Sequence, residues 1–421
     1  MIRRHLRPLI LDALGHFPVV AILGSRQVGK STLAQDLPSD DWPARYMTLD
    51  DFALLDAAQR DPDGFVDGLD LPVILDEVQR APDVLQSIKR VVDKARKPGQ
   101  FLLTGSANLL TLRSVSESLA GRVALFELHP FSWSELARSE APPDVIDRLF
   151  ACRTAKEFIV SLPLRTAAAR RGEFTKRLLA GGYPVPALME PGRARSQWFE
   201  SYRQTYLERD LREIANVVKL PDFGRLLVTA AANTGKLLNT AELSRDLGVP
   251  LNTVRRHLGL LETTFQVWTV EPYAANIRKR LVKTPKLYFG DTGMAAHLLA
   301  AEDWETLDRQ NRAGPMVETW AASELRKLTA LSEKRTEVFF WRTHTGREVD
   351  FLLARGIRLA GVEVKWAGRI ADSDIGALES CRDDLKGRLG LSAVLYSGTD
   401  AFALNDRVAA VPLGVFFSSR A

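Results

Sequence analysis

The chain has 421 residues, 46% hydrophobic and 26% charged, a composition typical of a water-soluble protein with core enough for about two to four domains. Its formal net charge of +5 at pH 7 is a mild excess of base that favours nucleic-acid binding only slightly. Cys152 and Cys381 are far apart and lack metal-ligand spacing, which argues against a disulfide framework or a zinc site. No apolar run reaches the roughly 18 residues of a membrane helix, and the N-terminus lacks the apolar core of a signal peptide. We therefore expect a cytoplasmic protein with no membrane segment.

The most informative segment follows an apolar, strand-like stretch at residues 19–23 and predicts a phosphate-binding loop. Two glycines let backbone N–H groups turn inward around a triphosphate, and the helix expected to begin there adds partial positive charge. Lys30 can reach the β- and γ-phosphate oxygens, and the Ser31 hydroxyl can coordinate Mg²⁺. The spacing predicts binding of a nucleoside triphosphate. The residues assigned to it are Gly24, Ser25, Gln27, Val28, Gly29, Lys30, Ser31 and Thr32.

A second apolar stretch, residues 73–75, ends in the two acids Asp76 and Glu77. An uninterrupted apolar run is typical of a strand in a parallel sheet that is covered on both faces. Asp76 at the carboxyl end of the strand would hold the metal and its water shell. Glu77 could orient and deprotonate the attacking water, so the pair predicts hydrolysis rather than storage of the nucleotide.

Polar side chains also follow a third apolar stretch, residues 101–104. A side chain at that edge could hydrogen-bond the γ-phosphate or the attacking water, with Ser106 as the first choice and Asn108 as the second. Arg122 precedes another apolar stretch, residues 123–126. An arginine there could reach the γ-phosphate bound by a neighbouring subunit, as a finger supplied in trans. A surface arginine or an ion pair within the chain is the alternative.

Four parts are expected along the chain. Residues 1–143 alternate between strand and helix patterns, which predicts an α/β nucleotide domain with a largely parallel sheet. Residues 144–215 are helical and highly charged and are interpreted as a helical lid and linker. Residues 216–290 form a winged-helix-like segment, and residues 291–421 form the last domain.

The winged-helix prediction depends on two helices separated by a short turn. A helix begins after Asn239 and ends before Gly248, and a second begins near Asn252. The second helix places Val254, Leu258 and Leu261 on its inner face and points Arg255, Arg256 and His257 mostly outward. Strand-like runs follow, with a basic cluster between them, as in a basic wing. The residues expected to contact DNA phosphates are Arg255, Arg256, Arg278, Lys279 and Arg280. A module used only for packing or protein contact is the alternative.

The last third carries a candidate second active site. Residues 338–343 and 348–353 predict a hairpin, and residues 357–365 predict the next strand, on which alternate side chains share a face. Acids can hold a metal and a lysine can position or activate water, which suits Mg²⁺-dependent phosphodiester cleavage. A solvated face of an amphipathic strand is the alternative. The residues of this candidate nuclease-like site are Glu318, Asp350, Glu363 and Lys365.

Motifs spread over almost the full length together resemble one known family. They lie at residues 24–32, 75–79, 103–106, 119–122, 181–184, 206–210, 285–293, 348–351 and 362–365. In this order they are similar to those of a prokaryotic family of predicted ATPases that pairs an AAA-type P-loop domain with the C-terminal domain of unknown function 4143 (DUF4143). The resemblance implies an α/β protein with an AAA-type P-loop NTPase domain, a helical lid, a winged-helix segment and a restriction-endonuclease-like C-terminal α/β domain.

The resemblance also implies cofactors and partners. ATP and Mg²⁺ are the expected cofactors, with Lys30, Ser31, Asp76 and Glu77 as the nucleotide and metal residues. Arg122 is implied as an arginine finger because relatives of this ATPase class usually work as rings, and a hexameric homo-oligomer is expected here. Glu318, Asp350, Glu363 and Lys365 match the nuclease-like signature, although such folds are often reused only for binding.

Three functions remain open from the sequence. The first is an ATP-driven machine that binds and remodels duplex or branched DNA as a ring. The second is an ATP-gated, metal-dependent DNA nuclease, and the third is a nucleotide-dependent switch that acts on a protein partner. The basic cluster at residues 278–286 favours the first two, and the modest net charge weakens that preference.

Overall fold

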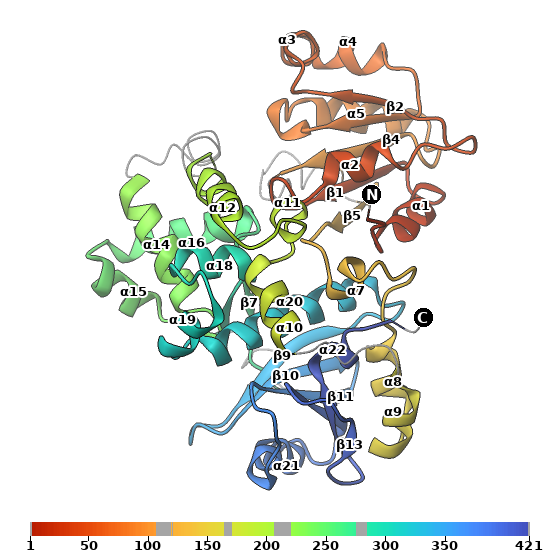
Figure 1. Ribbon diagram of the computed structural model, residues 1–421. Coiled ribbons are helices and arrows are strands. Elements are labelled where there is room, and N and C mark those ends of the chain that lie inside the picture. Colours follow the sequence, from red (N-terminus) through yellow and green to blue (C-terminus); the bar gives the residue numbers. More distant parts are fainter. Residues whose placement is uncertain are drawn as a thin grey trace. The chain divides into compact units, whose positions relative to one another are not determined.

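The structure is a computed structural model, and it forms two compact units (Figure 1). The first comprises residues 3–131 and 262–266, and the second residues 132–261 and 267–421. The residues that the structure describes are 2–106, 119, 121–163, 171–205, 220–274 and 284–419. The predictions for Asn108, Arg278, Lys279 and Arg280 lie outside this described part.

The first unit is built around a parallel five-stranded sheet, which confirms the predicted α/β fold of this part of the chain. The strands, in the order β2-β3-β4-β1-β5, are β2 (Arg45–Thr48), β3 (Val73–Asp76), β4 (Phe101–Gly105), β1 (Val19–Leu23) and β5 (Val123–Glu127). Every neighbouring pair is parallel. The three central strands are buried along their whole length, because helices cover both faces of such a sheet.

The first helix of this unit precedes β1, and the other four lie between successive strands. They are α1 (Arg7–Leu14), α2 (Lys30–Gln35), α3 (Phe52–Arg60), α4 (Pro62–Asp67) and α5 (Val84–Lys94). In α5 the buried apolar residues Val84, Leu85, Ile88 and Val92 recur at helical spacing, so one face of the helix joins the core of the sheet.

The strand register brings three predicted segments to one edge of this sheet. β1 and β3 both pair with β4, with Leu23 opposite Gly105 and Leu75 opposite Leu103. The carboxyl ends of these strands therefore lie side by side, which is where ligands bind in parallel α/β sheets. The loop after β1, the acids at the end of β3 and Ser106 after β4 meet at this edge.

The second unit contains an antiparallel three-stranded sheet and three helices, two of which lie between its first and second strands along the chain. The elements in chain order are α14 (Leu220–Ala232), β6 (Lys236–Leu237), α15 (Thr240–Leu247), α16 (Leu251–Thr263), β7 (Val267–Val270) and β8 (Lys286–Phe289), and the strand order is β6-β8-β7. Asn239 caps α15 by accepting from the Glu242 backbone N–H at 3.1 Å, and Gly248 ends that helix in the left-handed conformation. The two predicted helices are thereby confirmed.

One side chain of α16 was predicted wrongly. Val254, Leu258 and Leu261 are buried and Arg255 and Arg256 are exposed, as expected. His257, however, is buried and packs edge-on against Phe223, with ring centroids 5.2 Å apart. Positions 254, 257, 258 and 261 form one apolar stripe at helical spacing, so position 257 belongs to the inner face. Burial there lowers the pKa of His257.

A mixed six-stranded sheet forms the rest of the second unit. The strands, in the order β13-β14-β12-β11-β10-β9, are β13 (Phe402–Ala403), β14 (Val408–Pro412), β12 (Leu389–Tyr396), β11 (Arg358–Lys365), β10 (Glu348–Arg355) and β9 (Glu337–Arg342). β9, β10 and β11 run antiparallel, which confirms the predicted hairpin and the strand after it. β11, β12 and β14 run parallel.

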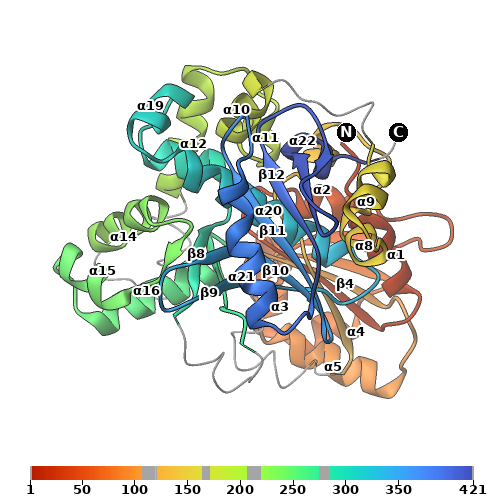
Figure 2. The ribbon, with the colours of Figure 1, turned by 90° about the horizontal axis from the view of Figure 1, so that it is seen from below.

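Helices cover both faces of this sheet. Residues of α20 (Ala313–Leu331), α8 (Val145–Ala151) and α9 (Ala155–Ser161) share a core with Phe351 and Leu353 of β10. α21 (Gly376–Asp384) lies across the other face, where it packs with Leu352 and Ala354 (Figure 2). Alternate residues of β10 therefore reach two different cores.

The remaining helices of the second unit are α7 (Trp133–Leu136), α10 (Arg171–Ala180), α11 (Pro184–Ala187), α12 (Arg193–Thr205), α18 (Thr292–Leu298), α19 (Trp304–Arg309) and α22 (Leu413–Phe416). Within the described residues, no helix combines the length and the apolar character needed to span a bilayer.

Candidate functional site

The loop between β1 and α2 has the backbone that its glycines predict. Gly24 and Gly29 have φ values of +150° and +98°, and Gln27 between them is also left-handed, at +58°. A Cβ atom at position 24 would lie 2.3 Å from the carbonyl oxygen of Leu128. Glycine is therefore required at position 24 both by the backbone angle and by the neighbouring strand end.

Arg4 supports this loop from the N-terminal segment. Its Nη1 donates to the Val28 carbonyl oxygen at 2.9 Å, and its Nη2 donates to the carbonyl oxygen of His129. The guanidinium stacks on the ring of Phe131, 4.7 Å from the centroid. Sequence analysis missed Arg4, because an arginine ahead of the first helix carries no motif.

Lys30, Ser31 and Asp76 lie together, as the sequence predicts. The Lys30 ammonium donates to the carbonyl oxygens of Gly24 and Ser25, both at 2.9 Å, so it sits inside the loop. The Ser31 hydroxyl donates to the Asp76 carboxylate at 2.9 and 3.1 Å. A hydroxyl beside a carboxylate is the kind of oxygen ligand set that Mg²⁺ uses with bound phosphates. The residues present fit ATP and Mg²⁺.

Two further hydroxyl groups orient Asp76. Thr104 on β4 donates to Oδ1, and Tyr46 on β2 donates to Oδ2 at 2.7 Å. Burial and the neighbouring Asp76 carboxylate raise the pKa of Tyr46 to about 12, so its phenol remains a neutral donor at physiological pH. Sequence analysis missed both residues, because their positions beside Asp76 depend on the strand order β2-β3-β4.

Glu77 and Ser106 are linked through a residue to which sequence analysis gave no role. Gln79 Nε2 donates to Glu77 Oε2 and, at 3.0 Å, to the Ser106 hydroxyl. Glu77 itself has a left-handed backbone, with φ +59°, and its N–H donates to Thr104 Oγ1 at 3.2 Å. The only earlier signal for Gln79 was its place at the end of the matched motif at residues 75–79, two positions after Glu77.

Arg122 is held by an acid of its own chain. Its Nε and Nη2 pair with the two oxygens of Asp93 at 2.6 and 3.0 Å, and this contact lowers the pKa of Asp93. The structure thus shows the alternative that sequence analysis named, an ion pair within the chain. The role of Arg122 as an arginine finger remains a prediction.

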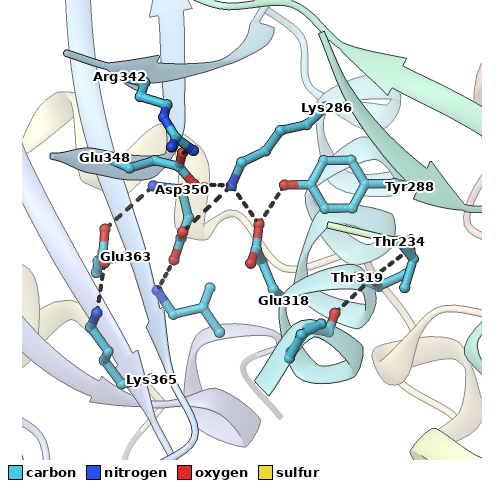
Figure 3. Close-up of polar contacts among 12 residues, drawn as sticks. Thr234, Lys286, Tyr288, Glu318, Thr319, Arg342, Glu348, Asp350, Glu363 and Lys365 are labelled. Carbon is cyan, nitrogen blue, oxygen red and sulfur yellow. Dashed lines mark hydrogen bonds and ion pairs between the residues drawn. The ribbon is translucent and has the colours of Figure 1, made fainter. Parts of the chain in front are cut away.

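The four predicted nuclease-like residues also come together, in the second unit (Figure 3). Lys365 pairs with Glu363 at 2.9 Å, and the other oxygen of Glu363 accepts from the Asp350 backbone N–H at 3.3 Å. Asp350 in turn accepts from the Val364 N–H at 2.9 Å. Glu363 is only 4% exposed, so it does not lie on a solvated strand face. Burial raises the pKa of both Glu363 and Asp350.

Lys286 lies at the centre of these acids, which sequence analysis did not foresee. Its ammonium pairs with Glu318 at 2.8 Å and with Glu348, and lies 3.8 Å from Asp350. The Tyr288 hydroxyl donates to the same Glu318 oxygen at 2.6 Å. A lysine at the start of an otherwise apolar strand was the available signal. Among the residues that the structure describes, no three His, Cys, Asp or Glu side chains are grouped as metal ligands.

The backbone of Glu77 leads to a stability prediction. A non-glycine residue in the left-handed region costs roughly 1–2 kcal/mol, so Glu77→Gly is expected to unfold with a free energy about 1 kcal/mol higher than Glu77→Ala. Both variants lose the same carboxylate, and urea unfolding followed by fluorescence measures the difference. At Asp56, within α3, the same two substitutions should give the opposite order, because glycine costs about 1 kcal/mol relative to alanine inside a helix. Equal stability of the two Glu77 variants would contradict the prediction.

Three family models match parts of the chain. Residues 16–137 match an AAA domain, residues 171–305 match a domain of unknown function (DUF8612), and residues 313–416 match a domain of unknown function (DUF4143). The chain is 31% identical over 411 residues to two relatives, the uncharacterized protein Rv2008c of Mycobacterium tuberculosis and the uncharacterized protein Mb2031c of Mycobacterium bovis. These alignments cover 97% of this chain and 83% of each relative.

Likeness to solved structures is weak. AMPPCP-bound DnaA from Aquifex aeolicus is 15% identical with a TM-score of 0.28, and the match covers 78% of this chain and 92% of that one. The STAND protein PH0952 from Pyrococcus horikoshii is 12% identical with a TM-score of 0.24, over 78% of this chain and 47% of that one. Such scores carry no argument about function. The matched domains and the two relatives show the family: the chain belongs to the prokaryotic family of predicted ATPases that pairs an AAA domain with DUF4143.

Proposed function

We propose that this protein hydrolyses ATP with Mg²⁺ and couples the reaction to binding and remodelling of DNA, duplex or branched, as a ring oligomer. The observation that carries the ATPase part is the grouping at one sheet edge. There the Ser31 hydroxyl lies 2.9 Å from the Asp76 carboxylate, and Glu77 is joined to Ser106 through Gln79. A metal-ligand pair next to a linked acid and hydroxyl suits hydrolysis of a phosphoanhydride.

Each side chain of this group has a proposed role. Lys30 exchanges its loop carbonyl partners for phosphate oxygens, and Ser31 and Asp76 hold the metal site. Mg²⁺, when bound, neutralises phosphate charge. Glu77 orients the attacking water and accepts its proton, while Ser106 contacts the γ-phosphate or the water. Gln79 positions the Glu77 carboxylate relative to Ser106.

The DNA part of the proposal is supported by the segment from α14 to β8. Two helices followed by paired antiparallel strands have the connectivity of a winged helix, and we assign that module here. Arg255 and Arg256 are exposed on α16, the second of the two helices, where they can contact phosphates. The basic residues 278–280 are proposed to add to this surface.

The ring is proposed on the basis of Arg122. To act on the nucleotide of a neighbouring subunit, its guanidinium must leave Asp93, whose side chain is 36% exposed. We keep the division into residues 1–143, 144–215, 216–290 and 291–421 as the proposed domain organisation.

A second candidate function is DNA cleavage by the C-terminal domain, to which we assign a restriction-endonuclease-like fold. Asp350, Glu363 and Lys365 on neighbouring strands, with Glu318 opposite, favour this candidate because acids and a lysine form such sites. Lys286 is an argument against DNA cleavage here, because its ammonium lies among the acids that would have to hold the metal.

The proposal predicts that DNA raises the rate of ATP turnover. Steady-state hydrolysis is measured at low salt with Mg²⁺, first without DNA and then with single-stranded, duplex and four-way-branched DNA. Stimulation of severalfold, strongest on one DNA structure, is the expected result, and it should fade as salt rises because phosphate contacts release counterions. A flat response across all four conditions would refute the DNA role and favour a switch that acts on a protein partner.

Single alanine variants provide the control for this measurement. Arg255→Ala and Arg256→Ala are expected to weaken DNA binding and to lower the slope of log affinity against log salt by about 1 each. Arg245→Ala removes another exposed arginine, from α15, the first helix, and should leave both quantities unchanged. Equal effects at positions 245, 255 and 256 would mean that α16 has no special role in DNA contact.

A further inference from the structure

The centre of the C-terminal acidic cluster is filled by a cation of the chain itself. Lys286 is 1% exposed, and its ammonium pairs with Glu318 on α20 at 2.8 Å and with Glu348 on β10. Asp350 on β10 lies 3.8 Å away. Figure 3 shows the lysine side chain reaching in from β8 to the point where these carboxylates meet. A buried carboxylate group needs a positive partner at this point, and Lys286 supplies it.

The cluster contains basic side chains of the chain itself among its acids. Its acids are Glu318, Glu348, Asp350 and Glu363, and its bases are Lys286, Lys365 and Arg342, the last of which pairs with Glu348 at 2.8 Å. Three basic side chains therefore lie among the four acids, and each of them pairs with at least one of these acids.

Several of the carboxylate oxygens that a metal would need are already engaged. The Glu318 oxygen nearest the centre accepts from both Lys286 and, at 2.6 Å, the Tyr288 hydroxyl. One oxygen of Asp350 accepts from the Val364 N–H at 2.9 Å, and one oxygen of Glu363 pairs with Lys365 at 2.9 Å. A divalent ion would have to displace the Lys286 ammonium and break these contacts.

We propose that Lys286 is the resident cation of this cluster, so that its ammonium occupies the position of a divalent metal and the wild-type chain binds no Mg²⁺ or Mn²⁺ there. The ion pairs link β8 to α20 and β10. The DNA cleavage considered above as a second candidate function does not take place at this site. Replacing Lys286 by a neutral residue uncovers a latent carboxylate site for a divalent cation.

Mn²⁺ binding to the nucleotide-free full-length chain tests the proposal, with the free ion measured by electron paramagnetic resonance. Wild type and Asp350→Asn are expected to bind the same amount of Mn²⁺, so any binding at the ATP site cancels in the comparison. Lys286→Met is expected to gain one Mn²⁺ per chain, and Lys286→Met with Asp350→Asn should lose it. Lys365→Met removes the same charge but leaves Lys286 in place, so it should gain none.

Two results would overturn the proposal. One is Mn²⁺ binding by wild type that Asp350→Asn abolishes, and the other is a folded Lys286→Met that gains no Asp350-dependent site. If Lys286→Met does not fold, the comparison of wild type with Asp350→Asn still decides, with equal binding as the supporting result. ATP turnover plays no part in these measurements, so the outcome is independent of the proposed ATPase and DNA functions.

Discussion

Glu77→Gln is expected to lower the rate of ATP turnover by about 10²–10⁴-fold, the usual contribution of a general base. The amide has nearly the shape of the carboxylate but cannot accept a proton from the attacking water. Ser31, Asp76 and Lys30 are unchanged in this variant, so ATP should still bind with Mg²⁺. Steady-state hydrolysis and binding of a labelled nucleotide, measured on the same preparation, separate the two effects.

Two controls make this result specific. Lys30→Ala should lose nucleotide binding as well as turnover, because the ammonium is the phosphate partner inside the loop. Asp83→Asn makes the same acid-to-amide change at an exposed position ahead of α5 and should leave both quantities unchanged. Turnover by Glu77→Gln within a factor of two or three of wild type would show that another group activates the water.

Lys286→Met is expected to lower the free energy of unfolding by about 3–5 kcal/mol, because it removes the cation from a buried group of carboxylates. Lost charge is the main cause, since methionine keeps most of the apolar volume of the lysine side chain. Glu318→Gln should therefore lower the free energy of unfolding less in the Lys286→Met background than in wild type. The difference between these two losses measures the coupling between Lys286 and Glu318. Urea unfolding followed by tryptophan fluorescence gives all four values of the cycle.

Lys236→Met is the matched control for this cycle. Lys236 lies on β6, which pairs with β8, but its side chain is exposed, so its replacement should change stability by no more than about 0.5 kcal/mol. Additive effects of Lys286→Met and Glu318→Gln would show that the two residues do not stabilise each other.

The nucleotide site could be predicted closely because its residues follow from local pattern. Gly24 and Gly29 are dictated by the loop backbone, and Asp76, Glu77 and Ser106 each stand where a buried strand ends. Carboxyl ends of parallel strands meet at one edge, so positions along the strands are enough to bring these side chains together. Arg4, Tyr46 and Thr104 were missed because their contacts depend on which strands are neighbours and on where the N-terminal segment lies.

In the second unit, too, local pattern predicted some features correctly and failed for others. The helix limits at Asn239 and Gly248 and the hairpin before β11 were predictable from capping residues and from alternation. His257 was placed wrongly because the positive charge of its neighbours outweighed the helical spacing of the buried residues around it.

The sequence by itself determined the family, the parallel nucleotide-binding sheet and the residues at its edge, because these depend on spacing within short segments. Only the tertiary structure decided the partners of the C-terminal acids. Lys286 and Glu318 are 32 positions apart, and their strand and helix meet only when the second unit is packed. Attraction between charges grows as water is excluded, so the two side chains interact strongly only after folding has buried them together, and no pattern in the sequence indicates the pair.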